Sequence, residues 1–184
     1  AGRTELSRVI FGIDPVGDGR ILVDGKEVKI TCPLDAIKAG IALVPEDRKD
    51  LGLILGMSVK DNMLLPKLGT FKSPVLNKKD ISNITGTYIQ DLSIALASEE
   101  EEVKNLSGGN QQKVVIAKWM AMNPKVLIMD EPTRGIDIGA KSEIYAIMRK
   151  LTEEGMSIIM ISSEMAEIQK VSDRVIVMHE GSVT

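Results

Sequence analysis

Several residue types are scarce in this 184-residue chain, and each scarcity excludes a class of protein. Aromatic residues make up 3% of the chain, so aliphatic side chains and ten methionines must fill the core. A single cysteine, Cys32, excludes an internal disulfide framework and favours a reducing compartment. The single histidine, His179, precedes Glu180 and Gly181 and is interpreted as part of a surface turn rather than as a catalytic group.

Long hydrophobic runs and an excess of basic residues are missing as well. The apolar runs at residues 126–129 and 158–161 are far too short to span a bilayer. Acidic residues slightly outnumber basic ones, which gives a formal net charge of −3. Because neutralising a nucleic-acid backbone requires a basic stripe, we expect no nucleic-acid partner.

The length predicts one domain over residues 1–184, and a hydrophobic content of 43% is enough for its core. In the second half of the chain, apolar strands alternate with amphipathic helices, which predicts an α/β fold with a parallel sheet and right-handed crossovers. Strands are expected at 41–44, 126–129, 157–161 and 175–178, and helices at 108–122, 140–152 and 163–171.

The first half is less regular. Asp24 and Gly25 separate two short strand-like segments, 19–23 and 26–30, and supply the positive φ angles of a two-residue turn, so we expect a β-hairpin. Further helices are expected at 3–11, 34–39, 59–65 and 77–92.

Two carboxylates, Asp130 and Glu131, directly follow the apolar stretch Val126–Met129. A buried strand would place them at its carboxyl end, the edge where α/β sheets bind ligands. An Asp there can hold Mg²⁺ through water, and the adjacent Glu can orient or deprotonate an attacking water. By itself, the motif leaves open that the acids cap the start of a helix or loop.

A glycine pair opens the helix expected at residue 108. Ser107, Gly108 and Gly109 leave several backbone N–H groups free of obstruction, and these donors together with the helix dipole favour a phosphate. The alternative is an ordinary helix N-cap made by Ser107.

The two motifs together narrow the interpretation. The order of Leu-Ser-Gly-Gly-Asn at 106–110, an apolar strand and Asp-Glu-Pro at 130–132 resembles an ATP-binding cassette (ABC) domain. The chain is similar over its whole length to the second, C-terminal cassette of bacterial ribose/galactose/xylose-type sugar importers. Segments 44–49, 130–137 and 161–164 add to this resemblance.

The resemblance implies a P-loop NTPase-type ABC cassette. Such a cassette has a mostly parallel sheet, a small antiparallel hairpin region and a helical subdomain, here at about residues 58–122, that contains the signature motif. Cassettes of this family have strands before the phosphate-binding loop. We therefore expect the chain to be an N-terminally incomplete cassette that binds ATP weakly by itself.

The resemblance also implies an ATP site with Mg²⁺. Gly2, Arg3 and Thr4 resemble the tail of a phosphate-binding loop, in which Arg3 replaces the usual lysine and Thr4 supplies the metal-binding hydroxyl. Asp130 is implied as the second metal-binding residue and Glu131 as the catalytic carboxylate.

Three further residues are implied to contact ATP. Glu46 stands where most cassettes carry Gln, Ser163 where most carry the His that senses the γ-phosphate, and Asp137 ends the loop that touches a partner cassette. Arg is bulkier than Lys, and Ser cannot carry positive charge. The site formed by Arg3 and Ser163 is therefore expected to bind nucleotide but to hydrolyse it poorly.

In the ABC family two cassettes pack head to tail, with each ATP between one phosphate loop and the opposite signature. The resemblance therefore implies that the signature completes the ATP site of a second cassette, expected to be fused upstream. The signature residues are Leu106, Ser107, Gly108, Gly109 and Asn110.

The function implied by the resemblance is an ATPase that powers sugar uptake. It would act with permease transmembrane subunits, and indirectly with a sugar-binding protein, as a peripheral subunit on the cytoplasmic face of the bacterial inner membrane. Two alternatives stay open. One is a degenerate cassette with a structural or regulatory role that completes only the partner's site. The other is a soluble ABC ATPase acting on DNA or ribosomes, against which the acidic charge balance weighs.

Overall fold

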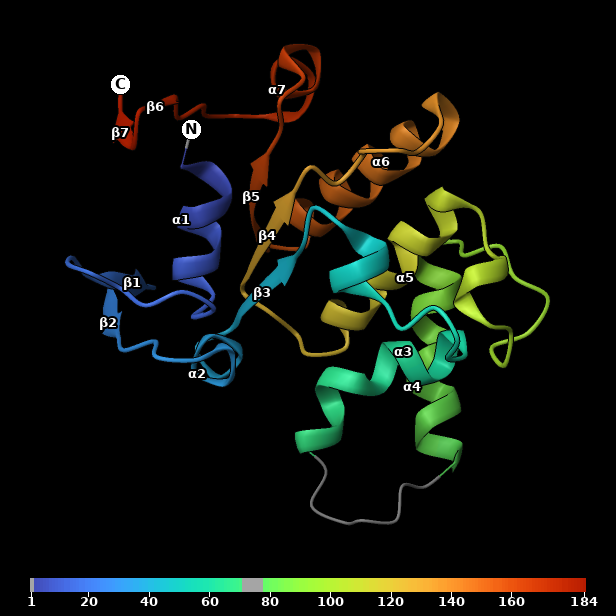
Figure 1. Ribbon diagram of the computed structural model, residues 1–184. Helices are drawn as coiled ribbons and strands as arrows, with labels where there is room; N and C mark the ends of the chain where they lie inside the picture. Colours follow the sequence, from blue (N-terminus) through green and yellow to red (C-terminus); the bar gives the residue numbers. More distant parts are fainter. Residues whose placement is uncertain (1, 71–77) are drawn as a thin grey trace.

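The computed structural model describes residues 2–70 and 78–184 (Figure 1). Its centre is a three-stranded parallel sheet in the order β3–β4–β5, formed by Ile41–Val44, Val126–Asp130 and Ser157–Ile161. The register pairs Ile41 with Val126, and Val126 with Ser157. The predicted α/β fold with a parallel sheet is confirmed.

Helices surround this sheet close to the positions that the sequence predicted. Helix α7 starts two residues later than expected, because Ser163 and Glu164 form the loop after β5. The α-helices are α1 (Arg3–Ile10), α2 (Pro33–Lys38), α3 (Val59–Leu64), α4 (Lys78–Asp91), α5 (Gly108–Met120), α6 (Ile138–Glu153) and α7 (Met165–Val171). The π-turn η1 (Arg48–Gly52) and the 3₁₀ turns η2 (Leu65–Thr70) and η3 (Val103–Asn105) complete the helical elements.

Both faces of β3 and β4 are covered, because alternate residues of these two strands enter two different cores. On one face, side chains of β3 and β4 pack with α5 and α6; on the other, they pack with the end of α1 and with α2. Trp119 contacts both cores, and its ring meets the Phe11 ring edge-on at 5.4 Å. The first core takes Ala42, Val44, Leu127 and Met129 from the strands, and the second takes Ile41, Leu43 and Ile128.

The expected hairpin is present as β1 (Ile21–Val23) and β2 (Lys26–Val28), and it lies beside α1 in Figure 1. Asp24 and Gly25 both have positive φ angles, 51° and 73°, as the two-residue turn requires. Gly12, which ends α1, has a φ of 76°, and a Cβ there would lie 2.7 Å from the Cys32 carbonyl. Glycine therefore lets α1 end directly against the start of α2.

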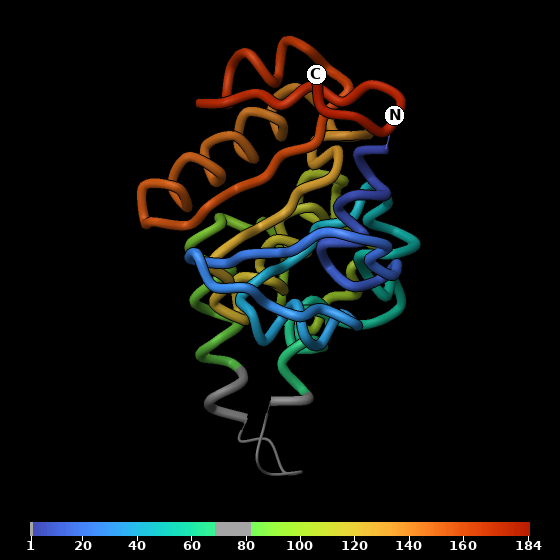
Figure 2. The backbone as a smooth tube through the Cα atoms, turned by 90° about the vertical axis from the view of Figure 1, so that its left-hand side faces the viewer, coloured from blue at the N-terminus to red at the C-terminus, as the bar shows by residue number. Residues whose placement is uncertain are grey.

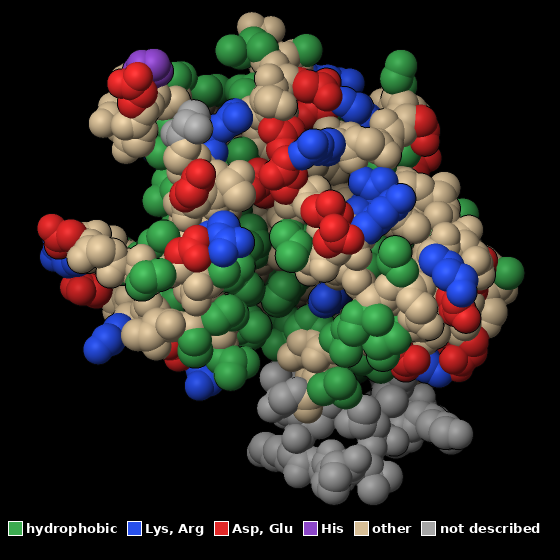
Figure 3. Space-filling model, in the orientation of Figure 1, with side chains coloured by type: hydrophobic (Ala, Val, Ile, Leu, Met, Phe, Trp, Pro, Cys, Tyr) green, Lys and Arg blue, Asp and Glu red, His purple; other side chains and the backbone are tan. Residues whose placement is uncertain are grey.

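Helices α3, α4 and α5 pack together on the opposite side of the sheet from the hairpin (Figures 1 and 2). The Tyr88 hydroxyl donates to the Met120 carbonyl at 2.9 Å and ties α4 to α5. Acidic and basic side chains are interspersed over the upper part of the face in Figure 3, and hydrophobic side chains gather in the hollow at its centre.

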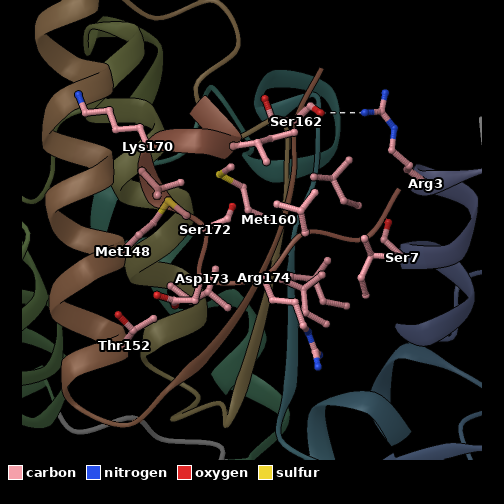
Figure 4. A pocket seen from close by; sticks show the side chains of 18 of the residues that line it. Arg3, Ser7, Met148, Thr152, Met160, Ser162, Lys170, Ser172, Asp173 and Arg174 are labelled. Atoms are coloured by element: carbon pink, nitrogen blue, oxygen red, sulfur yellow. Dashed lines mark hydrogen bonds between the residues drawn. The ribbon is translucent and has the colours of Figure 1, made fainter. Parts of the chain in front are cut away.

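The expectation of a strand at 175–178 is wrong. Strand β6 comprises only Met178–His179 and pairs with β7 (Ser182–Val183) in a short antiparallel hairpin. Residues 175–177 have no strand beside them within the described chain, and a strand requires a hydrogen-bonding neighbour. A cavity of about 580 Å³ separates this segment from β5, α1 and α6 (Figure 4).

The two ends of the described chain lie side by side in Figures 1 and 2. A Cβ on Gly2 would lie 3.5 Å from the Met178 side chain and 3.6 Å from the Gly181 backbone. Within residues 2–70 and 78–184, every helix is too short or too polar to cross a membrane.

Candidate functional site

Asp130 ends β4 at the carboxyl edge of the sheet, as the sequence predicted. Its side chain is 2% exposed, and its Oδ1 has no hydrogen-bond partner among the described residues. Burial raises the pKa of Asp130, a hydrogen bond from Thr4 opposes this shift, and the negative charge of Glu131 adds to it. A buried carboxylate oxygen without a protein donor is uncommon, and it marks a position where a cation or water can bind.

Glu131 follows in an unusual backbone conformation. Its φ angle is 45°, in the left-handed region, which is costly for a residue with a side chain. Its N–H donates to the Ile161 carbonyl at 2.9 Å, so the end of β4 is bonded to the end of β5. Its own carbonyl accepts from the Arg134 N–H at 3.0 Å, which closes a turn. The strained conformation persists because bonds on both sides hold it.

Arg3 and Ser163 lie at the same edge, where the ends of β4 and β5 meet the start of α1. The Arg3 guanidinium donates to the Ser162 carbonyl at 2.8 Å (Figure 4). Ser163 is exposed in the loop after β5. Gly2 has a φ of 88° and forms the N-cap of α1, which directs Arg3 and Thr4 toward this edge. Of the residues predicted for the chain's own ATP site, Arg3, Thr4 and Glu131 therefore lie near Asp130.

Two side-chain oxygens, one from Asp130 and one from Thr4, could serve as ligands of a magnesium ion. Mg²⁺ is usually held by one or two protein oxygens, with water and substrate phosphates completing its shell. The free buried oxygen of Asp130 and the adjacent hydroxyl of Thr4 match that requirement. Within the described chain, no group of three or more His, Cys, Asp or Glu residues could hold a metal by itself.

Glu46 makes a different contact. Its carboxylate is ion-paired with Arg134 in the loop that follows β4. Arg48 binds the same loop through its guanidinium, which donates to the carbonyls of Arg134 at 2.7 Å and Gly135 at 3.1 Å. Asp137, at the end of this loop, caps α6 by accepting from the Ala140 N–H at 2.9 Å. The segment after β3 is therefore fastened to the segment after β4.

The signature motif forms the start of α5 and lies beside the loop after β4. The N-cap interpretation of Ser107 is confirmed: its Oγ accepts from the backbone N–H of Asn110 at 3.4 Å and from the side-chain amide at 3.1 Å. Asn110 in turn accepts from the Ala95 N–H at 2.9 Å. A Cβ on Gly109 would lie 2.5 Å from the Cβ of Ala140, so this glycine permits α5 to approach α6 closely.

Leu106 and Gly108 complete the signature. Leu106 packs partly buried against the larger core. A Cβ on Gly108 would lie 2.9 Å from the Arg48 guanidinium and 3.3 Å from the Gly135 carbonyl. The signature therefore adjoins the loop that contains Gly135 and Asp137.

Sequence reasoning missed Glu167 on α7, whose side chain is 4% exposed. Burial by itself would raise the pKa of Glu167, but the hydrogen bonds to its carboxylate outweigh burial and lower it to about 2. An acid one turn before Val171, on the inward face of an amphipathic helix, was the available signal. The donors are Thr133 Oγ1, Tyr145 OH at 2.7 Å, Ser162 Oγ at 2.8 Å and Lys141 Nζ at 3.0 Å.

Comparison with known proteins gives the chain's relatives. The family model described as ABC transporter matches residues 1–134, more than half of the chain. A ribose import ATP-binding protein RbsA of Bacillus cereus is 52% identical over the whole chain, and that of Oceanobacillus iheyensis is 54% identical. The chain spans 37% of the length of each of these two relatives.

Solved structures of other proteins share the fold of this chain. The chain matches cbiO1 of Clostridium perfringens, part of the cbiONQ ABC transporter complex, with a TM-score of 0.81 and 28% identity over 100% of the chain and 71% of that protein. A nucleotide-free ATP-binding cassette of an ABC transporter has a TM-score of 0.84 at 22% identity, with 99% of this chain and 74% of that protein covered. On the family match and the shared fold, the chain belongs to the ABC transporter family.

Proposed function

We propose that the chain is the ATP-binding and ATP-hydrolysing cassette of a monosaccharide importer. The observation that supports this most directly is at the carboxyl end of a parallel strand: one buried oxygen of Asp130, beside the Thr4 hydroxyl, has no hydrogen-bond partner among the described residues. Asp130 and Thr4 would hold Mg²⁺ through these two oxygens, and the ion would supply positive charge next to the phosphates of ATP. The relatives named for ribose import support a monosaccharide as the transported molecule.

In this proposal each group at the edge of the sheet has a separate task. Thr4 and Asp130 would hold Mg²⁺, whose charge would offset that of the phosphates. Gly2 and Arg3 bind phosphate from the start of α1, and Glu46, Ser163 and Asp137 approach ATP from the neighbouring loops. Glu131 orients the attacking water or accepts its proton, and the remaining catalysis is positioning and charge stabilisation.

The partners belong to the proposal too. The signature at 106–110, within a helical subdomain of about residues 58–122, would complete the ATP site of a second cassette. The relatives are much longer than this chain, so a second cassette could be part of the same polypeptide. Permease subunits would hold both cassettes at the cytoplasmic face of the membrane, and a sugar-binding protein would deliver the sugar.

A second candidate function rests on the contact made by Arg3. Its guanidinium is engaged by the Ser162 carbonyl, and the neighbouring Ser163 cannot supply positive charge to a phosphate. The chain would then be a degenerate cassette with a structural or regulatory role. It would complete the partner's ATP site through its signature while contributing little hydrolysis of its own.

ATP hydrolysis by the assembled transporter that contains this chain tests both candidates. If the chain's own site works, Glu131→Gln lowers hydrolysis about a hundredfold or more, since it removes the group that activates water. If the chain serves only the partner's site, Ser107→Arg abolishes hydrolysis while Glu131→Gln is nearly silent. Glu153→Gln and Ser98→Arg make the same changes at exposed positions and serve as controls. Wild-type hydrolysis in both Glu131→Gln and Ser107→Arg would reject both candidates.

A further inference from the structure

The carboxylate of Glu167 joins the two loops that border the candidate site. Its Oε1 accepts from the Thr133 hydroxyl, in the loop after β4, and its Oε2 accepts from the Ser162 hydroxyl, at the end of β5. The Tyr145 hydroxyl and the Lys141 ammonium bind the same carboxylate from α6. One buried acid thus accepts from three separate elements.

Glu131 lies between the two attachments. It precedes Thr133 by two residues, and its N–H is bonded to the Ile161 carbonyl, the residue before Ser162. A residue close to each end of this bond therefore donates to the same carboxylate: Thr133 on the Glu131 side and Ser162 on the Ile161 side. Because a left-handed conformation at a residue with a side chain relaxes unless its surroundings fix it, these attachments matter most at Glu131.

The loop after β5 is held by the same set of contacts. Besides donating to Glu167, the Ser162 Oγ accepts from the Glu164 N–H at 3.0 Å. Lys141 bridges Glu164 at 2.6 Å and Glu167 at 3.0 Å. The Ser162 carbonyl accepts from Arg3, so the contacts extend to the start of α1. The loop after β5 is therefore held in place through both its backbone and its side chains.

We infer that Glu167 is a positioning residue: through Thr133 and Ser162 it holds Glu131 in its left-handed conformation against the end of β5. The inference rests on the proposed function only where it concerns hydrolysis. The carboxylate of Glu167 is fully engaged by the groups that donate to it, so its effect is on the geometry of Glu131 and not on chemistry of its own.

Two variants separate positioning from plain stabilisation. Thr133→Val and Tyr145→Phe each delete one hydroxyl that donates to Glu167 Oε1, so both should lower stability similarly. Only Thr133→Val cuts the attachment next to Glu131. We therefore expect exchange of the Glu131 amide hydrogen, measured by NMR in the nucleotide-free protein, to be about tenfold faster in Thr133→Val and unchanged in Tyr145→Phe.

Thr133→Ser keeps the hydroxyl and should restore wild-type exchange. If Thr133→Val does not fold, Ser162→Ala removes the attachment on the other side and should produce the same faster exchange. Equal exchange rates at Glu131 in Thr133→Val and Tyr145→Phe, or no change in either, would overturn the inference. Because this readout needs no ATP, it decides the inference even if the proposed function fails.

In a wild-type protein that hydrolyses ATP at this site, Thr133→Val should lower kcat about tenfold and leave KM within about twofold, whereas Tyr145→Phe should change neither. A wild-type protein without hydrolysis would count against the proposed function alone. Faster exchange in Thr133→Val with an unchanged kcat would show that the position of Glu131 does not matter for the reaction, and would overturn that part of the inference.

Discussion

Two buried acids at the same edge of the sheet have opposite electrostatic environments. Glu167 accepts hydrogen bonds from several protein groups, and its pKa is lowered to about 2. Asp130 has an oxygen without any partner among the described residues, and burial raises its pKa. Both carboxylate oxygens of Glu167 thus accept hydrogen bonds, whereas one oxygen of Asp130 accepts none from the described residues. The first arrangement keeps the carboxylate charged inside the fold, and the second is one to which a cation or water can bind.

The largest expected effect is at Glu167. Its pKa falls from an ordinary 4.5 to about 2 on folding, so its charge stabilises the folded state by about 3 kcal/mol above pH 4.5. Since the folded pKa is the lower one, this contribution is lost as the pH falls from 4.5 to about 2. Glu167→Gln should therefore lower the free energy of unfolding by about 3 kcal/mol at neutral pH and by little near pH 2.

Urea denaturation across this pH range measures the effect. Glu164→Gln is the matched control, because Glu164 shares the partner Lys141 but is exposed, with 55% of its side chain accessible. It should change stability by less than about 0.5 kcal/mol. Equal losses of stability in the two variants would mean that burial and the hydroxyl donors add nothing to the stabilisation by Glu167. The contrast between Glu167 and Asp130 would then disappear.

A smaller effect of opposite sign is expected at Asp130. Replacing it by Asn removes a buried charge that the protein does not satisfy, so Asp130→Asn should raise the free energy of unfolding by about 1 kcal/mol in metal-free buffer at neutral pH. Because the folded pKa is raised above 3.8, the gain is absent at lower pH and develops as the pH rises through the raised value.

Addition of Mg²⁺ and ATP sharpens this prediction. The wild-type protein should gain stability from them, and Asp130→Asn should not, since the variant lacks the carboxylate that binds the ion. Thermal unfolding with and without Mg-ATP measures both changes. An Asp130→Asn protein less stable than wild type in metal-free buffer would mean that the orphaned oxygen is satisfied in solution.

The smallest expected effect is spectroscopic. Burial and the hydrogen bond to Glu167 raise the pKa of Tyr145 to about 12. In Glu167→Gln the negative partner is gone, so ultraviolet titration should show the pKa of Tyr145 moving down toward 10. Tyr88, the other tyrosine, has a pKa raised by burial and by Asp91, and serves as an internal reference that should not move. An unmoved Tyr145 would contradict the contact with Glu167.

Much of the fold could be predicted because it depends on local patterns. The periodicity of apolar residues located the helices, and Asp24 with Gly25 located the hairpin turn. The buried strands β4 and β5 were evident from continuous apolar runs. The strand expected at 175–178 had a similar pattern, but residues 175–177 have no strand beside them in the described chain, and strand pairing depends on context beyond the local pattern.

The candidate site was predictable only as separate pieces. The pair Asp130–Glu131 and the segment at 106–110 stood out by composition. Glu167 did not, because its place one turn before Val171 is a weak signal of burial and its hydrogen-bond partners are distant in sequence. Its partner Thr133 is 34 residues away, and Arg3 reaches Ser162 across 159 residues.

By itself, the sequence determined the order of the elements, the ends of most of them and the motifs by which the chain resembles its family. Those features follow from backbone preferences and from apolar spacing within one segment. Only the tertiary structure decided that Glu167 is satisfied while Asp130 is not, and that Glu131 is held in a strained conformation. The physical reason is that burial and hydrogen-bond partners come from other segments, and these meet only when the sheet and its helices have packed.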